Sequence, residues 1–573
     1  MHIEILELEN FRKLKSVRIG VADETTVLVG ANNSGKTSAM LALRYFLVEP
    51  ERGRFSLNDF TLSHWPAIDQ MGLVWENARK ENLPLPSPDW EPILPFLDVW
   101  LHAEMTEAHF VQKLIPTLDW NGGRLGVRLR LEPKNALQLQ KDYLIARDEA
   151  RRIEAADKGA EDSGGSEVQS TVVLWPRSLT DFMRRRFGSL FTVKSYLLDP
   201  EKLVDPEHDE AKPQALPEAP VPIDGEPFKG LIRIDEIGAQ RGFGQVDRLR
   251  DLDDDGTLSG SIATRRMSDQ LRRYWSKHLD PLENPDQQDI EALRAIEKAQ
   301  QAFDARLRDG FSPAIQEVEG MGYPGVTDPK LKISTRLKPV DGLNHDAAVQ
   351  YVITANDGEN SIELNLPEDS NGLGYQNLIS MIFRLMSFRD AWMRVGKAAA
   401  TDALIPPLHL VLIEEPEAHL HTQVQQVFIR QAYKVLRKHS DLGASKALKT
   451  QLVVSTHSSH IAHECDFDHL RYFRRLPAAG QSVPLSCVVN LGTVFGTDVE
   501  TKRFVTRYIK VTHCDLFFAD AAVFVEGPAE RILVPFFVKN HPEFAMLHEC
   551  YITWLEIGGS HAHRFRSLVE LLA

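Results

Sequence analysis

A glycine-rich segment near the start of this 573-residue chain restricts its possible folds more than any other part of the sequence. It reads Gly30-Ala31-Asn32-Asn33-Ser34-Gly35-Lys36-Thr37 and fits the pattern G-x-x-x-x-G-K-[ST]. An apolar run at residues 27–29 precedes it, and residues 38–47 have the apolar spacing of a helix. A strand, a loop and a helix in this order place backbone N–H groups around an anion. The sequence therefore predicts a nucleotide-phosphate site in an α/β domain.

Each part of this loop has a physical role. The glycines let backbone N–H groups close around phosphates, and Lys36 supplies positive charge to the outer phosphates. Thr37 offers a hydroxyl group to Mg²⁺, so the predicted cofactors are ATP and Mg²⁺. The residues predicted to bind nucleotide are Gly30, Asn32, Asn33, Ser34, Gly35, Lys36, Thr37 and Ser38.

The second half of this site follows late in the chain. The apolar run at residues 408–413 ends in Glu414-Glu415-Pro416-Glu417. A buried strand that delivers two adjacent carboxylates suits a site where one contacts Mg²⁺ and the other orients the attacking water. His457 follows a predicted strand at residues 451–455, where an imidazole could touch a γ-phosphate.

Composition places the chain among ordinary globular proteins, with 43% apolar and 26% charged residues. Its length predicts several domains. No apolar run reaches the length of a membrane span, and the N-terminus lacks the layout of a signal peptide. Four cysteines lie far apart, as expected of free thiols in a reducing cytoplasm. We therefore expect a cytoplasmic protein without a membrane partner.

Charge bears on nucleic-acid binding. The balance of 66 basic and 81 acidic residues gives a net charge of −15, which argues against a protein that simply coats nucleic acid. Two local clusters could still contact DNA. They are Arg184-Arg185-Arg186 and Arg471-Tyr472-Phe473-Arg474-Arg475.

Periodicity outlines the remaining elements. Short strands are expected in the first thirty residues and at residues 97–101 and 127–131. Polar composition predicts a surface loop at 155–169 and an irregular segment at 200–227. Residues 261–308 have helical spacing, and strands alternate with helices again from residue 408.

This layout resembles an ABC-type ATPase head of the DNA-maintenance kind, with a long helical insertion between its two halves. Glu9-Asn10-Phe11-Arg12 resembles the N-terminal strand motif of that group. Asn371-Gly372-Leu373-Gly374-Tyr375-Gln376 resembles a degenerate signature loop, although the usual serine-glycine-glycine core is absent. In such proteins this loop reaches across a dimer to the partner's ATP. The resemblance implies two heads that meet and places Gln376 among the nucleotide-binding residues.

The carboxylate run Glu414-Glu415-Pro416-Glu417 at the end of the predicted strand resembles the corresponding motif of OLD-family (overcoming lysogenization defect) proteins. The resemblance makes Glu414 a metal ligand, where most ABC ATPases carry aspartate. It makes Glu415 the catalytic base and His457 the switch histidine, with Lys36 as the third catalytic residue.

The C-terminal segment Val523-Phe524-Val525-Glu526-Gly527-Pro528-Ala529-Glu530 looks like the opening of a TOPRIM domain. An ATPase head followed by TOPRIM is the layout of OLD-family nucleases, and the resemblance covers nearly the whole chain. It implies an ATP-regulated, metal-dependent DNA endonuclease, often in phage defence. Glu526 and Glu530 are then ligands of Mg²⁺ or Mn²⁺, DNA is a partner, and the chain forms a homodimer or higher oligomer.

One departure from this pattern is clear, because no Asp-x-Asp follows Gly559. One or two carboxylates hold a metal pair poorly. We therefore expect weak nuclease activity from this chain alone, as a fragment or as half of a split protein completed by a partner. A DNA-maintenance sensor or scaffold without nuclease activity is the alternative, and a transporter ATPase subunit is a third interpretation. An Asp-x-Asp in the reading frame beyond Ala573 would favour the nuclease, and a stop codon the alternatives.

Four domains are expected. Residues 1–260 form the N-terminal part of the ATPase domain, and residues 261–330 a helical insertion. Residues 331–510 form the C-terminal part of the ATPase domain, and residues 511–573 a partial TOPRIM-like domain. The insertion could be a dimerisation arm or a subdomain packed on its own chain.

Overall fold

The computed structural model describes residues 1–573 except 118, 162–173, 208, 240–266, 282–286, 321–349, 358–359, 368–371, 397–403, 419, 445–446, 477, 479–482, 495–498, 510–512, 559–560 and 573. These residues form two compact units. The first comprises Met1–Ala239, Pro406–Ala418 and Thr422–Ala573, and the second Gln240–Ile405 with His419–His421. The division into four domains stays a prediction.

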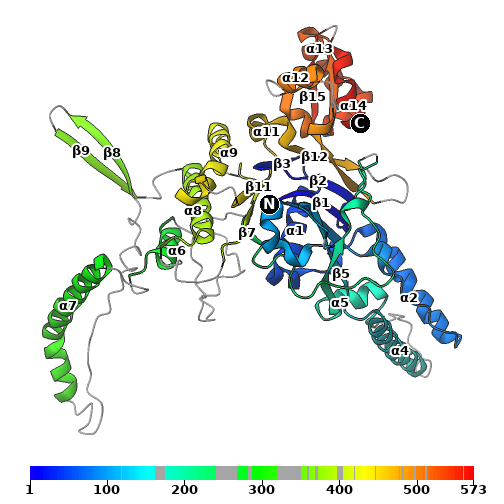
Figure 1. Cartoon of the computed structure of the whole chain (residues 1–573), viewed down its shortest axis with the longest axis horizontal. Helices are drawn as coiled ribbons and strands as arrows, with labels where there is room; N and C mark the ends of the chain where they lie inside the picture. Colours follow the sequence, from blue (N-terminus) through cyan, green and yellow to red (C-terminus); the bar gives the residue numbers. More distant parts are fainter. Residues whose placement is uncertain are drawn as a thin grey trace. The chain divides into compact units, whose positions relative to one another are not determined.

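A six-stranded sheet in the first unit carries the glycine-rich loop (Figure 1). Its strands are, in spatial order, β13 (Leu485–Asn490), β12 (Leu470–Leu476), β3 (Thr25–Val29), β11 (Lys449–Ser455), β10 (Leu408–Glu414) and β7 (Ile232–Ile237). All neighbours from β12 to β7 are parallel, so their carboxyl ends meet at one edge. Open parallel sheets bind ligands at that edge.

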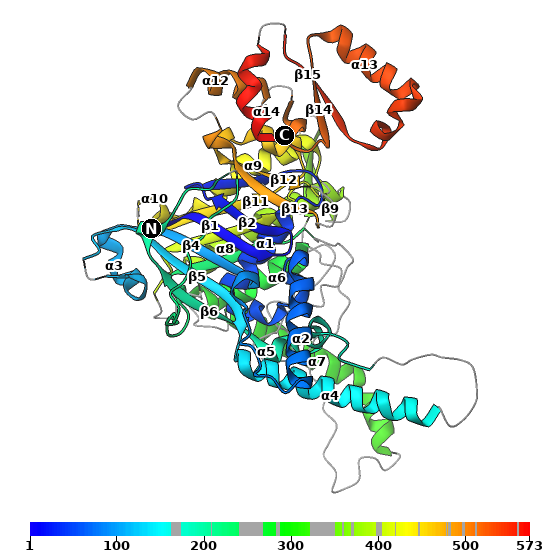
Figure 2. The same ribbon diagram turned by 90° about the vertical axis from the view of Figure 1, so that its right-hand side faces the viewer.

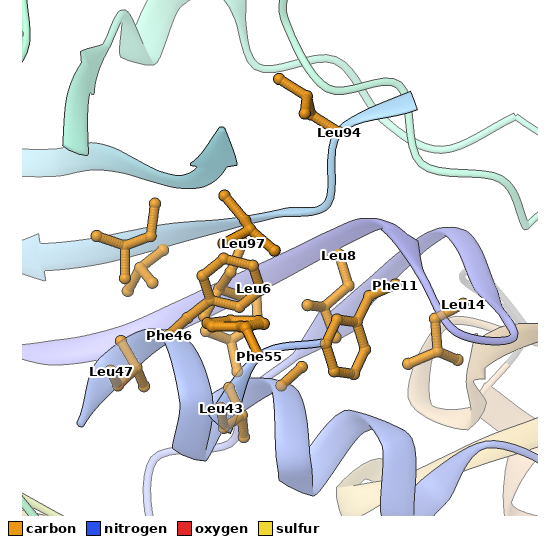
Figure 3. Close-up of a cluster of buried hydrophobic side chains, with 14 of the residues drawn as sticks. Leu6, Leu8, Phe11, Leu14, Leu43, Phe46, Leu47, Phe55, Leu94 and Leu97 are labelled. Atoms are coloured by element: carbon orange, nitrogen blue, oxygen red, sulfur yellow. The ribbon is translucent and has the colours of Figure 1, made fainter. Parts of the chain in front are cut away.

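A five-stranded antiparallel sheet forms the other layer. Its strands are β2 (Leu14–Gly20), β1 (His2–Phe11), β4 (Phe96–Ala103), β5 (Gly123–Pro133) and β6 (Phe191–Leu198). Helix α1 (Lys36–Leu47) contacts strands of both sheets. Figure 3 shows its Phe46 beside Leu6 of β1, and the Phe46 ring also packs edge-on against Phe11. The helix that begins at the glycine-rich loop is thereby fixed in the core.

Helices α2 (Trp65–Lys80), α4 (Ala136–Glu161) and α5 (Leu179–Leu190) lie side by side in the first unit (Figures 1 and 2). The other helices of the predicted ATPase part of this unit are α3 (Ala108–Val111), α9 (Thr422–Arg437), α10 (Ser440–Ala444), α11 (Ser459–Glu464) and α12 (Val499–Tyr508). At the C-terminal end, β14 (Ala521–Val525) pairs in parallel with β15 (Ile552–Glu556). Helix α13 (Pro528–Asn540) connects them, and α14 (Arg566–Leu572) follows.

The second unit is mainly helical. It contains α6 (Met267–His278), α7 (Gln287–Gly320), α8 (Leu373–Trp392) and a hairpin of β8 (Gln350–Asp357) and β9 (Asn360–Pro367). Helix α6 packs on α8, where the Tyr274 hydroxyl donates to Asp390 at 2.8 Å. Whether the insertion acts as a dimerisation arm stays a prediction.

Most predicted elements are present, including the irregular segment after β6. The surface loop predicted at residues 155–169 is wrong in its first part, because α4 continues to Glu161. Alanine and glutamate in this stretch are strong helix formers and extend the helix. Residues 162–169 lie outside the described part. No helix among the described residues is long and apolar enough to cross a membrane.

Candidate functional site

The glycine-rich loop connects β3 to α1 at the carboxyl edge of the six-stranded sheet. Gly30 has a φ of 152°, and a Cβ atom there would lie 2.5 Å from the carbonyl oxygen of Phe473. Gly35 precedes the helix with a φ of 98°. Both positions therefore require glycine, because a side chain would be strained or would collide with β12.

Lys36 lies under this loop with only 3% of its surface exposed. Its ammonium group donates to the carbonyl oxygens of Gly30 (2.6 Å) and Ala31 (2.9 Å) and to the Ser34 hydroxyl (3.2 Å). No carboxylate of the described residues lies within ion-pair distance of it. Burial lowers the pKa of Lys36 to about 8, against the opposing effect of Glu415 and Glu417. A buried cation surrounded by neutral acceptors and backbone turns fits the phosphates of a nucleotide.

His457 connects Lys36 to Glu415. Its Nδ1 lies 3.4 Å from the Lys36 ammonium and its Nε2 lies 3.3 Å from a Glu415 carboxylate oxygen. Because an ammonium group only donates, Nδ1 accepts and the ring proton is on Nε2, directed at the carboxylate. Burial and the charge of Lys36 lower the pKa of His457, although Glu415 opposes this. The imidazole is therefore neutral at pH 7, and three predicted catalytic residues form one series of contacts.

Glu415 is held in an uncommon backbone conformation. Its φ of 44° is positive, and its N–H donates to the Ser455 carbonyl oxygen at 2.8 Å. Positive φ values are uncommon for non-glycine residues and cluster at functional sites. This backbone turns the chain after β10, so that Glu415 and His457 meet across neighbouring strands.

Glu417 is a site residue to which the sequence patterns assigned no role. Its carboxylate accepts from the His457 N–H at 2.5 Å and from the Thr456 hydroxyl at 2.9 Å. Burial raises its pKa, although these hydrogen bonds oppose the rise. Glu417 therefore fixes the backbone that carries His457, and only its place in the Glu-Glu-Pro-Glu run could have indicated this.

Glu414, the predicted metal ligand, ends β10 next to β7. Burial and then the nearby charge of Glu236 raise the pKa of Glu414 to about 7. The Ala239 N–H donates to its carboxylate at 3.4 Å, and Arg44 pairs with Glu236 at 3.2 Å. Two half-buried carboxyl groups whose mutual repulsion a cation would relieve fit a divalent metal ion. Sequence patterns did not indicate Glu236.

A cavity of about 540 Å³ opens beside the loop, within the usual size range of ligand pockets, roughly 300–1,000 Å³. The predicted residues that line it are Asn33, Ser34, Gly35, Lys36, Thr37, Ser38 and His457. Its remaining wall includes residues not predicted to bind nucleotide, namely Arg12, Lys13, Asn58, Phe60, Leu62 and Trp65. The aromatic and apolar side chains in this wall, Phe60, Leu62 and Trp65, suit the base of a nucleotide.

Three predicted nucleotide-binding residues, Gly30, Asn32 and Gln376, are not part of this lining. Asn32 is exposed. Gln376 is buried in α8 of the second unit, whose helix begins after Gly372, as the signature-like pattern predicts. Its role at the nucleotide stays a prediction.

The TOPRIM-like segment places Glu526 directly after β14 and Glu530 in the first turn of α13. Both side chains are exposed, and the Glu530 carboxylate accepts from the Gly527 N–H at 3.0 Å. Glu556, which no sequence pattern singled out, ends the parallel neighbour β15 and pairs with Arg531 at 3.1 Å. The described residues contain no group of three or more side chains arranged to hold a metal ion. The metal roles of Glu526 and Glu530 stay predictions.

A charged contact joins the two parts of the first unit. Arg475 of β12 pairs with Asp520, which precedes β14. The other carboxylate oxygen of Asp520 accepts from the Tyr551 N–H at 3.0 Å, next to β15. Because Phe473, two residues before Arg475, lies against Gly30, the same strand contacts both the glycine-rich loop and the TOPRIM-like segment.

The burial of Lys36 predicts proton uptake when a nucleotide binds. Above a pKa of about 8 the ammonium group is largely neutral without nucleotide, and an adjacent phosphate restores its charge. Binding should therefore take up a proton near pH 9, and ATP affinity should fall by up to about tenfold per pH unit above that pKa. Calorimetry in buffers of different ionisation enthalpy measures this. Lys36→Arg, which stays charged, is the control; equal uptake in both proteins would contradict the assignment.

A parallel sheet with a phosphate loop, adjacent carboxylates and an imidazole at one edge defines a P-loop ATPase. The chain belongs to the AAA ATPase domain family, whose model matches residues 1–87 and 238–462, more than half of its length. The TOPRIM domain of overcoming-lysogenization-defect-like proteins matches residues 517–573. These matches confirm the predicted α/β ATPase head followed by an OLD-type TOPRIM domain. Such domains generally use ATP and divalent metal ions.

Two curated relatives are similar to this chain. Endonuclease GajA of Bacillus cereus (strain HuB5-5) is 22% identical over 591 residues, which cover 100% of this chain and 72% of that protein. OLD nuclease of Thermus scotoductus (strain ATCC 700910 / SA-01) is 28% identical over 170 residues, 30% of this chain and 28% of that protein. Among solved structures, the SMC head domain from Thermotoga maritima is 12% identical, with a TM-score of 0.30 over 86% of this chain and 99% of that chain.

Proposed function

We propose that this chain is an ATP-hydrolysing head that controls a metal-dependent DNA endonuclease of the TOPRIM type, in phage defence or DNA processing. The observation that carries the ATPase part is the contact series from Lys36 through His457 to Glu415 beside the cavity. The nuclease part is supported by the TOPRIM match and by relatives named as nucleases. We place the activity in the cytoplasm, where ATP and phage DNA meet.

Each residue of the ATPase site has a proposed role. Lys36 holds the outer phosphates, and Thr37 and Glu414 would hold Mg²⁺, which neutralises phosphate charge when bound. Glu415 orients the attacking water and accepts its proton, while His457 positions the Glu415 carboxylate. We further propose that two copies meet, so that the loop containing Gln376 approaches the partner's nucleotide.

Glu526 and Glu530 are the proposed ligands of Mg²⁺ or Mn²⁺ at the nuclease site, and the substrate is DNA. Their position after a strand and in the first helical turn supports this role, since oxygen ligands suit these ions. A further segment or a partner protein would supply additional carboxylates.

Nicking of supercoiled plasmid by the product of the complete coding sequence tests the nuclease part. With ATP and Mg²⁺ or Mn²⁺, Glu526→Ala should lower the rate by at least about tenfold, because a metal ligand is lost. Glu549→Ala, another exposed carboxylate of this segment, is the matched control. Undiminished nicking by Glu526→Ala would remove the TOPRIM assignment. ATP hydrolysis without any metal-dependent nicking would favour a DNA-maintenance sensor or scaffold instead.

A further inference from the structure

Three consecutive arginines stand out on α5. Arg184, Arg185 and Arg186 are all exposed, and no carboxylate of the described residues lies within ion-pair distance of them. In a chain with a net charge of −15, three such neighbouring cations form an unusual surface. We refer to these three residues as the α5 arginine surface.

Aromatic rings hold these arginines in place. The guanidinium carbons of Arg185 and Arg186 lie 5.0 and 5.4 Å from the ring centre of Trp175. The guanidinium carbon of Arg184 lies 5.4 Å from the ring centre of Trp65. Two side chains thus converge on one ring although they leave the helix in different directions. Side chains ordered before binding lose less conformational entropy when they meet a ligand.

The same packing selects the kind of ligand. Trp175 stacks on Phe182 with ring centres 5.6 Å apart and 19° between the planes. Its ring therefore contacts Phe182 as well as the two guanidinium groups. The guanidinium groups, rather than the rings, therefore meet a ligand. Guanidinium forks recognise phosphate oxygens, and phosphate contacts to a duplex need no unpaired bases.

The second basic cluster of the sequence is used differently. Arg471 is buried and donates to the carbonyl oxygens of Gly20, Asp468 and Leu470. Arg475 pairs with Asp520. Its arginines therefore stabilise the fold, whereas those of α5 keep their donors directed to solvent.

We infer that the α5 arginine surface binds the phosphate backbone of duplex DNA. This inference rests on the proposed function, because it assigns the DNA of that activity to a place on the protein. Trp65 lies under Arg184 and also lines the nucleotide cavity, so DNA on this surface would lie close to the nucleotide wall.

Fluorescence anisotropy of a labelled duplex with the full chain, in EDTA and over a salt series, tests the inference. The triple variant Arg184→Gln, Arg185→Gln, Arg186→Gln should bind roughly tenfold more weakly near physiological salt. The plot of log affinity against log salt has a negative slope, which should become less steep by about 0.9 for each lost phosphate contact. The triple Arg→Lys variant keeps the charge and should retain most of the affinity.

The matched control removes the same charge from exposed residues of α7, with Arg294→Gln, Arg306→Gln and Arg308→Gln. It should bind within about twofold of wild type. An equal loss in both triple variants, wild-type binding by the α5 variant, or binding of single strands alone would overturn the inference. Wild-type protein that binds no DNA would overturn the proposed DNA substrate as well. If the α5 triple variant melts early, the single variants Arg185→Gln and Arg186→Gln replace it, each expected to lower the slope by about 0.9.

Discussion

Lys36→Ala should reduce ATP hydrolysis at least about a hundredfold, because it removes the buried cation of the phosphate loop. Without the ammonium group, the carbonyl oxygens of Gly30 and Ala31 lose their shared donor and the loop loses the contact between Lys36 and His457. Both the binding of the outer phosphates and the position of the imidazole should therefore suffer. Steady-state phosphate release and equilibrium nucleotide binding measure the two effects separately.

Lys80→Ala, at the exposed end of α2, is the control for the loss of one lysine and should hydrolyse ATP like wild type. A rate of ATP hydrolysis in Lys36→Ala close to that of the control would contradict the ATPase assignment. A fall in turnover together with an early thermal transition would show instead that the loop had unfolded, which Lys36→Arg then separates from the loss of charge.

Glu415→Gln should slow turnover about a hundredfold or more while ATP still binds, because an amide cannot accept the proton of the attacking water. Glutamine has the same shape and can keep the backbone hydrogen bond to Ser455 and a contact with the Nε2–H of His457. We therefore expect a fall in kcat with little change in KM, and stable retention of bound ATP. Single-turnover kinetics with radiolabelled ATP measure this.

Glu417→Gln is the informative comparison for this prediction. It should weaken the hydrogen bonds to the His457 N–H and the Thr456 hydroxyl and lower turnover only moderately, because Glu417 positions the segment that carries His457. If Glu417→Gln abolished hydrolysis and Glu415→Gln did not, the catalytic base would be Glu417. Glu24→Gln, an exposed carboxylate before β3, should leave turnover unchanged.

Local sequence patterns were sufficient to predict the strands and the helix around the nucleotide site. The strand, loop and helix at residues 25–47 follow from alternating apolar residues, two glycines and good helix formers, which act over a few neighbouring residues. The same holds for β10, whose uninterrupted apolar run suits a strand buried on both faces. Strand β7 was not predicted, since its alternation of isoleucines with charged residues follows a long irregular segment.

Contacts between distant segments were not accessible in this way. Lys36 and His457 are separated by 421 positions, and their approach depends on β11 lying between β3 and β10. The role of Glu417 depends on the same strand order. The two arginine clusters look alike in sequence, yet one bonds to backbone carbonyls and Asp520 while the other packs on tryptophans and faces solvent.

The sequence by itself indicated the phosphate loop and the TOPRIM-like opening at Glu526, and it predicted Glu414, Glu415 and His457 as partners of that loop, because these motifs are short runs of residues. Only the tertiary structure decided which side chains meet. Parallel strands bring residues hundreds of positions apart to one sheet edge, and no local pattern records strand order. Burial then moved the pKa values of Lys36 and Glu414 away from their usual ranges, and the extent of burial follows from the folded structure.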